Sequence, residues 1–334
     1  MLSSPTLSAL EKPWWSGSRP LLALVLAAVS LRWFFCLVAY PLVLYRHTLT
    51  GATYFFDHYL PFAQNILAGH GYRIAPGGPA VLDRPPGYMA VMLPVAASGE
   101  HAALVMHLLH GLLGGLAVCL TVALARRTGL GGRASFLAGG LVAFWPFLIW
   151  ETKVSVPENL LVALVPAVLL AFARWHQGNG VGWAALAGAL AGWATLTHGL
   201  YQVLLPVLVI AVLSVGIPRR RRLAGAAALV LAAAAVVMPW TLHTSNAAGR
   251  WIGVATGLGH HYLKGVTTFA LLARPADYFT DIEGMLWKEM RSLVVREGFD
   301  AHDDTLIRSD PAINRRLDEL ARADLRARPV PAAC

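Results

Sequence analysis

The chain has 334 residues, of which 57% are hydrophobic and only 13% are charged. A soluble domain usually carries charge on about a quarter of its residues, so this composition favours an integral membrane protein. The formal net charge of +9 would suit a nucleic-acid partner. However, many of the cations lie in short loops between apolar segments, as expected of cytoplasmic loops. We therefore expect contacts with membrane lipids and no contact with nucleic acid.

The cysteines give no sign of a disulfide framework or a metal cluster. Cys36 and Cys119 lie inside apolar segments, and Cys334 is terminal, so no regular cysteine spacing is present. The first apolar segment is longer than the apolar core of a signal peptide, contains Arg32 and lacks a clear cleavage site. We expect it to be kept as a membrane anchor.

Apolar segments predict an all-α polytopic membrane protein with about seven transmembrane helices. Residues 1–19 form the expected cytoplasmic N-terminus, and residues 20–240 form the expected transmembrane domain. The predicted spans are residues 21–45, 101–125, 134–150, 160–173, 182–196, 201–217 and 223–240. The loops after the second, fourth and sixth spans are basic, which places them on the cytoplasmic side.

Two features inside the predicted spans need a structural explanation. A charge such as Arg32 at the bilayer centre costs about 2.5–3.5 kcal/mol on an insertion scale. Arg32 could extend to the membrane surface, pair with a neighbouring helix or line a cavity. The small residues Gly188 and Gly192, and earlier Gly111, Gly114 and Gly115, predict close packing between helices.

Residues 46–100 form the expected first extracytoplasmic loop, and its stretch from Tyr54 to Tyr88 is too rich in Gly and Pro to cross a bilayer. The first part of this stretch predicts an amphipathic helix that ends near Gly69. Its apolar residues recur every three or four positions: Phe55, Phe56, Tyr59, Phe62, Ala63, Ile66 and Leu67. We expect the aromatic side chains to face the lipid, with Asp57 near the aqueous rim. Residues 89–97 predict a second short helix against the membrane.

Several polar residues of the outer side are candidates for chemistry. Asp57 could act as a general base on an acceptor hydroxyl or amine, or it could simply be solvated. Arg84 lies between Asp83 and Pro85–Pro86. The prolines restrict its backbone, and a guanidinium suits phosphate oxygens. The alternative is a surface pair of Asp83 with Arg84, which is worth little.

Other polar groups lie further along the chain. Glu151 and Glu158 stand at the outer end of a predicted span and could face a cavity, although we expect Glu151 to be an exposed carboxylate at a helix end. His260, His261 and Lys264 follow glycines and could wrap a phosphate or a sugar. No third ligand stands at a fixed spacing from the His pair, so we predict no metal site. Residues 241–334 form the expected charged extracytoplasmic tail, with an amphipathic run over residues 313–325.

The ordered motifs of this chain resemble those of membrane glycosyltransferases with the GT-C fold. The most similar group is the bacterial relatives of the dolichyl-phosphate-mannose protein mannosyltransferases and of the lipid A aminoarabinose transferase. The matching pieces are Asp57 with Tyr59, Ala63, Leu67 and Gly69; Gly69–Tyr72; Arg84–Tyr88; Pro157–Glu158; Gly192–His198; and Pro239–Leu242. The resemblance covers roughly residues 20 to 265.

This resemblance implies transfer of a sugar from a polyprenyl-phosphate donor to an envelope acceptor, at the outer face of a bacterial inner membrane. By analogy Asp57 and Glu158 are the catalytic carboxylates, with Asp57 as the base. Asp83 and Arg84 would match the family's acidic–basic pair, with Arg84 near the donor phosphate. The expected substrate-binding residues are Asp83, Arg84, Tyr88, His198, His260, His261 and Lys264. The resemblance leaves open whether a divalent cation serves as cofactor.

Two alternatives remain at the level of sequence. A transporter or flippase would favour broken helices, ionisable groups at mid-membrane and an internal repeat, and we find no repeat. A catalytically inactive, truncated relative is the other, since family members continue with further spans. The family's Asp also usually stands four residues before the Tyr, whereas Asp57 stands two residues before Tyr59.

Overall fold

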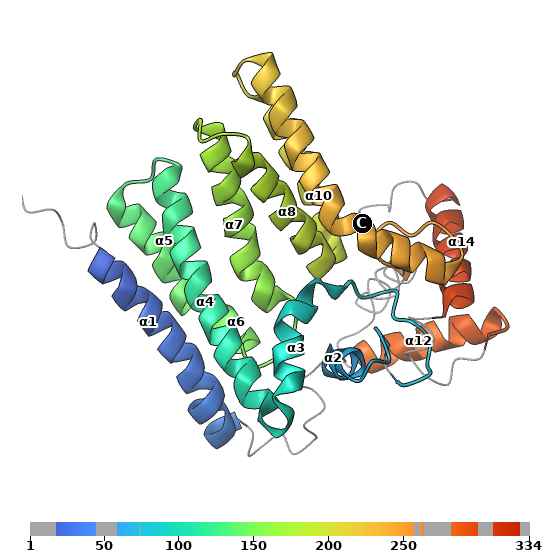
Figure 1. The fold of residues 1–334 in the computed structure, drawn as a ribbon. Helices are drawn as coiled ribbons and strands as arrows, with labels where there is room; N and C mark the ends of the chain where they lie inside the picture. The colour runs from blue at the N-terminus through green and yellow to red at the C-terminus, as the bar shows by residue number, and fades with distance from the viewer. Residues whose placement is uncertain are drawn as a thin grey trace, which may run out of the picture. The chain divides into compact units, whose positions relative to one another are not determined.

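The computed structural model describes residues 18–44, 59–73, 75–256, 262–263, 282–299 and 310–327. Within these ranges the regular structure is helical (Figure 1), apart from one isolated bridge between Arg73 and Ala80. The chain forms two compact units. One comprises Met1–Gln64 and Pro86–Val237, and the other comprises Asn65–Pro85 and Met238–Cys334. The prediction of an all-α membrane protein is confirmed.

The first unit is built from helices, the second and last of which continue into the second unit. In chain order they are α1 (Ser18–Phe34), α2 (Tyr59–Leu67), α3 (Met89–Ala97), α4 (Ala102–Arg127), α5 (Gly132–Phe144), α6 (Pro146–Glu151), α7 (Glu158–His176), α8 (Gly182–Thr197), α9 (Leu204–Ser214) and α10 (Arg219–Ala248). A π-helix over Phe35–Leu44 extends α1, and the short 3₁₀ helices η5 (Pro86–Tyr88) and η7 (Gly199–Val203) precede α3 and α9.

Each predicted span contains helix within the described residues, but the helices differ in length. Among these residues, four helices are long and apolar enough to cross a membrane: Ser18–Leu42, Gly99–Arg127, Glu158–His176 and Arg219–Ala248. The other predicted spans correspond to α5 with α6, to α8, and to η7 with α9. The helix expected over residues 134–150 is broken because Trp145, which precedes Pro146, adopts an extended backbone, as residues before proline prefer.

Hydrogen bonds join the basic loops at one end of the first unit. The Gln177 side chain donates to the Arg127 carbonyl over 2.7 Å, which links the α7–α8 loop to the α4–α5 loop. Arg221, at the start of α10, donates to the Trp175 and His176 carbonyls. The loops that the Lys/Arg bias placed on the cytoplasmic side therefore lie together.

Glycines allow the close helix packing that the sequence predicts. A Cβ added to Gly188 of α8 would overlap the backbone of Leu229 in α10. Likewise, a Cβ on Gly114 of α4 would overlap the side chain of Arg32 in α1, and one on Gly115 would meet Val29. Contacts this short require glycine at the interface.

Arg32 pairs with a neighbouring helix, and its side chain does not extend to the membrane surface. It is only 1% exposed. Its guanidinium donates to the carbonyls of Ala143 at 2.9 Å and Val142 at 3.0 Å, at the end of α5, and to that of Ala28 at 3.1 Å. The Val142 carbonyl needs this donor because Pro146, four residues on, has no N–H. A cation is also favourable at a helix C-terminus.

The aromatic face of α2 points into the protein, so the expectation that it faces lipid is wrong for the described part of the helix. Tyr59 and Phe62 are 4% and 1% exposed, and the Tyr59 ring packs edge-on against Tyr88 at 5.1 Å. Residues 55–58 lie outside the described residues. The second predicted helix is confirmed as α3, which buries Met92 and Val95.

The second unit contains α12 (Ile282–Arg296) and α14 (Pro311–Ala327), so the predicted amphipathic run forms a helix. Met290 and Val294 of α12 pack against Ile313 and Leu317 of α14. Ion pairs connect α14 to other parts of this unit. Arg316 pairs with Glu297 at 2.6 Å, and Asp318 pairs with Arg250 at 3.0 Å.

Candidate active site

The predicted site residues are distributed over both units. Tyr88, Glu158 and His198 belong to the first unit, whereas Asp83 and Arg84 belong to the second. Asp83 and Arg84 are half-buried, and each makes interactions within the protein. The other predicted residues, Asp57, His260, His261 and Lys264, lie outside the described residues. Their roles stay predictions.

The segment Pro86–Tyr88 is anchored against α8 and α4. Tyr88 is fully buried, and its hydroxyl lies 2.6 Å from Nε2 of His110 in α4. The Trp193 indole donates to the Gly87 carbonyl over 2.9 Å. A Cβ on Gly87 would lie 2.5 Å from the backbone of Leu196 and of the following residue in α8. Only glycine allows this segment to lie so close to the end of α8.

His110 joins Tyr88 to the turn that follows α6. Its Nδ1 lies 2.9 Å from the Thr152 carbonyl oxygen. A carbonyl can only accept, so Nδ1 carries the proton and Nε2 accepts the Tyr88 O–H. Sequence reasoning missed His110. Its signal was a pair of histidines, His107 and His110, within an otherwise apolar span, where ionisable residues are rare and often functional.

The turn between α6 and α7 is held from both sides. The Asn159 amide donates to the carbonyls of Glu151 at 3.0 Å and Val154 at 2.9 Å. His107 of α4 interacts with the backbone of Lys153. The geometry of the turn is therefore fixed by side chains from α4 and α7.

This turn presents two carboxylates and a cation. Burial raises the pKa of Glu151 above its usual range, the neighbouring Glu158 raises it further, and Lys153 lowers it. Glu151 is half-buried, whereas the sequence led us to expect an exposed carboxylate. Lys153 is 9% exposed, and its Nζ lies 3.9 Å from the centroid of the Trp150 ring, a cation–π geometry.

Glu158 and His198 lie at the same end of the bundle. Glu158 is the first residue of α7, and His198 follows the last residue of α8. The loop that joins α7 to α8 is among the basic loops, so these two residues lie at the opposite end. Both are exposed, and Nδ1 of His198 accepts from the Leu200 N–H at 3.2 Å. The end of the bundle opposite to the basic loops therefore carries accessible ionisable groups.

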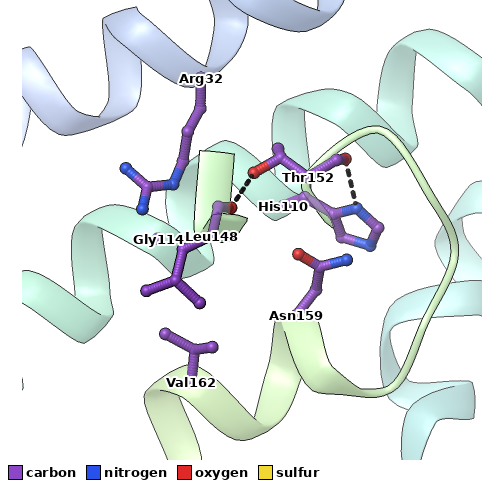
Figure 2. Close-up of a pocket in the computed structure, with 7 residues that line it drawn as sticks. All are labelled: Arg32, His110, Gly114, Leu148, Thr152, Asn159 and Val162. Carbon is purple, nitrogen blue, oxygen red and sulfur yellow. Dashed lines mark hydrogen bonds between the residues drawn. The ribbon is translucent and has the colours of Figure 1, made fainter. Parts of the chain in front are cut away.

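A small cavity lies inside the bundle, next to the turn between α6 and α7 (Figure 2). Its lining residues are Arg32, His110, Gly114, Leu148, Thr152, Asn159 and Val162. The volume within which the centre of a water molecule can lie is about 10 Å³. The cavity therefore has room for about one water. A sugar would not fit there. Among the described residues, no group of three or more His, Cys, Asp or Glu side chains could hold a metal ion.

Comparison with known proteins finds a family match in the central part of the chain. Residues 83–243 match the dolichyl-phosphate-mannose-protein mannosyltransferase family. The resemblance predicted from the motifs is thereby confirmed. The matched range covers a little under half of the chain and includes Asp83, Arg84, Tyr88, Glu158 and His198. No curated protein matches the chain. The match supports a membrane glycosyltransferase of the GT-C type.

Proposed function

We propose that the protein transfers a sugar from a polyprenyl-phosphate carrier to an acceptor at the outer face of a bacterial inner membrane. The observation that carries this proposal is the placement of Glu158 and His198 at the end of the bundle opposite to the basic loops, within the family-matched range. The anchored segment Pro86–Tyr88 packs against α8 one residue before His198.

The chemistry of the donor explains why these residue types are needed. Transfer breaks the bond between the sugar's anomeric carbon and a phosphate oxygen, and it forms a bond from that carbon to an acceptor oxygen or nitrogen. Arg84 binds the carrier phosphate, whose charge grows as the bond breaks. Asp57 takes the proton of the acceptor. Glu158 supports the reacting groups, and the other predicted residues except Tyr88 contact the phosphate or the sugar. Tyr88 is buried and hydrogen-bonded to His110, so its expected contact with substrate is replaced by a role in holding the segment.

Site variants test these roles in purified protein supplied with a radiolabelled polyprenyl-phosphate sugar. Asp57→Asn abolishes release of carrier phosphate while the protein still inserts in the membrane. Arg84→Gln raises KM for the donor, because the guanidinium contributes binding energy. Glu158→Gln lowers kcat.

A carboxylate to which the proposal gives no role provides the control. Glu100 lies on the short helix before α4, with a side chain that is 88% exposed and only His101 as an ionic neighbour among the described residues. Glu100→Gln keeps wild-type kinetics. Wild-type rates in Asp57→Asn would remove Asp57 from the mechanism, and an unchanged donor KM in Arg84→Gln would remove Arg84 from the phosphate site.

A further inference from the structure

We propose that His110 is a positioning residue of the transferase, an inference that rests on the proposed function. Its two ring nitrogens hold two separate segments of the outer end: the Tyr88 segment through Nε2 and the α6–α7 turn through Nδ1. His110 lies within α4 and is 1% exposed, so it acts through these neighbours and not by contact with substrate.

The donor and acceptor roles in the two hydrogen bonds fix the protonation state of His110. The Thr152 carbonyl accepts from Nδ1, which leaves Nε2 as the acceptor for the Tyr88 hydroxyl. A doubly protonated ring would place an N–H against that hydroxyl and end its donation to Nε2. The network therefore needs a neutral His110 with its proton on Nδ1.

The hydrogen bond between Tyr88 and Nε2 of His110, the first arm of the network, positions the segment that follows Arg84. Tyr88 contacts His110 through its hydroxyl and Tyr59 through its ring. The neighbouring Gly87 is held by Trp193. Arg84 precedes Gly87 by three residues and Asp57 precedes Tyr59 by two residues in the chain. Release of Tyr88 therefore loosens the segment from which the phosphate-binding guanidinium extends.

The hydrogen bond between Nδ1 of His110 and the Thr152 carbonyl, the second arm, positions the turn that leads into α7. Thr152 is 1% exposed and is held by the His110 ring and by its own hydroxyl bond to the Leu148 carbonyl (Figure 2). Asn159, next to Glu158, holds the far end of the turn. Loss of the Thr152 contact therefore displaces the turn beside Glu158 and leaves the Tyr88 segment in place.

Helix packing alone does not require this network. The interfaces of α4 with α1 and of α8 with α10 are made by glycines against side chains or backbone, and α1, α4 and α5 share an apolar cluster. Buried polar groups are costly in such surroundings unless every bond is made. A fully bonded histidine at this point fixes the geometry of the two segments.

Two conservative variants separate the arms. His110→Asn places an amide N–H near the position of Nδ1, so it keeps the Thr152 bond and loses the Tyr88 bond. His110→Gln places an amide oxygen near Nε2, so it keeps the Tyr88 bond and loses the Thr152 bond. A misplacement of 1 Å can cost about 100-fold in rate, and we expect effects of about ten- to a hundred-fold.

The kinetic result we expect is a split between the variants. His110→Asn and Tyr88→Phe raise the donor KM about equally, and the double variant is no worse than either one because a single bond is lost. His110→Gln lowers kcat with little change in KM. Ser135→Ala, which removes a buried side-chain hydrogen bond to the Leu130 carbonyl at the basic end, provides the control and keeps both constants.

The failure of this inference is distinguishable from failure of the proposed function. Wild-type protein that cleaves no polyprenyl-phosphate sugar contradicts the function itself. Active wild type together with His110→Asn and His110→Gln variants of unchanged kcat and KM overturns the positioning role. Nitrogen-15 NMR of the histidine ring gives a readout independent of turnover: a proton on Nδ1 supports the network, and a proton on Nε2 overturns it.

Discussion

Replacement of Gly87 by alanine tests whether the Pro86–Tyr88 segment must lie directly against α8. The new Cβ would lie 2.5 Å from the Leu196 carbonyl carbon and the Thr197 nitrogen, whereas ordinary contact begins at 3.4 Å. Both neighbours are backbone atoms of a helix that is packed on α7 and α10, so they cannot swing away. The segment itself must move by about 0.9 Å.

This displacement sets the size of the expected effects. Overpacking of a tight interior costs about 1–3 kcal/mol of stability. A misplacement of about 1 Å can lower the rate of an enzyme by about 100-fold, even when the change is distant from the reacting groups. The displacement also stretches the Trp193 bond to the Gly87 carbonyl, which is 2.9 Å long at present. We therefore expect Gly87→Ala to lose both transfer activity and stability, by about 100-fold and about 1–3 kcal/mol respectively.

The assay compares Gly87→Ala with Gly199→Ala in the same detergent. Gly199 follows His198, has no positive φ, and a Cβ there would meet no atom within 4 Å. Gly199→Ala should keep wild-type transfer and wild-type melting. If Gly87→Ala transferred sugar at the rate of Gly199→Ala, the claim that the segment must lie against α8 would be refuted.

Three further substitutions test the packing within the units, two by thermal unfolding and one by amide exchange. Gly188→Ala should cost about 1–3 kcal/mol because its Cβ overlaps α10, whereas Gly140→Ala, which meets nothing within 4 Å, should not destabilise; equal melting of the two would contradict the α8–α10 contact. Arg32→Lys should cost about 1–3 kcal/mol for each carbonyl left unsatisfied, because an amine lacks the guanidinium fork, and an unchanged melting temperature would contradict the cap on α5. Asp318→Asn should weaken the partly buried pair with Arg250 and speed amide exchange in α14; exchange as slow as in the wild type would show that the pair is dispensable.

The sequence was sufficient for the parts of the fold that depend on local pattern. Apolar length and 3.6-residue periodicity are properties of a single segment, so the helices at Met89–Ala97 and in the predicted spans could be located. The Lys/Arg bias depends only on loop composition, and it placed on one side the loops that Gln177 and Arg221 join. The Gly188 interface followed from small-residue spacing.

The remaining features depend on partners that are distant in the chain. Arg32 finds its acceptors in α5, 110 and 111 residues away. The Val142 carbonyl is available because Pro146 lacks an N–H, and the Ala143 carbonyl is available because α5 ends at Phe144. Tyr59 faces Tyr88 and not lipid, a choice that periodicity cannot make because both surroundings are apolar. Burial of Glu151 beside Glu158 likewise depends on how the turn folds.

The most direct test of the proposed transfer reaction uses purified protein in liposomes with a polyprenyl-phosphate sugar labelled on the sugar. The proposal predicts that the label leaves the lipid and that an equal amount of free polyprenyl phosphate forms, with neither product in Asp57→Asn. Label that stays on intact lipid would contradict the proposal. Label that crosses the bilayer uncleaved would identify a flippase instead.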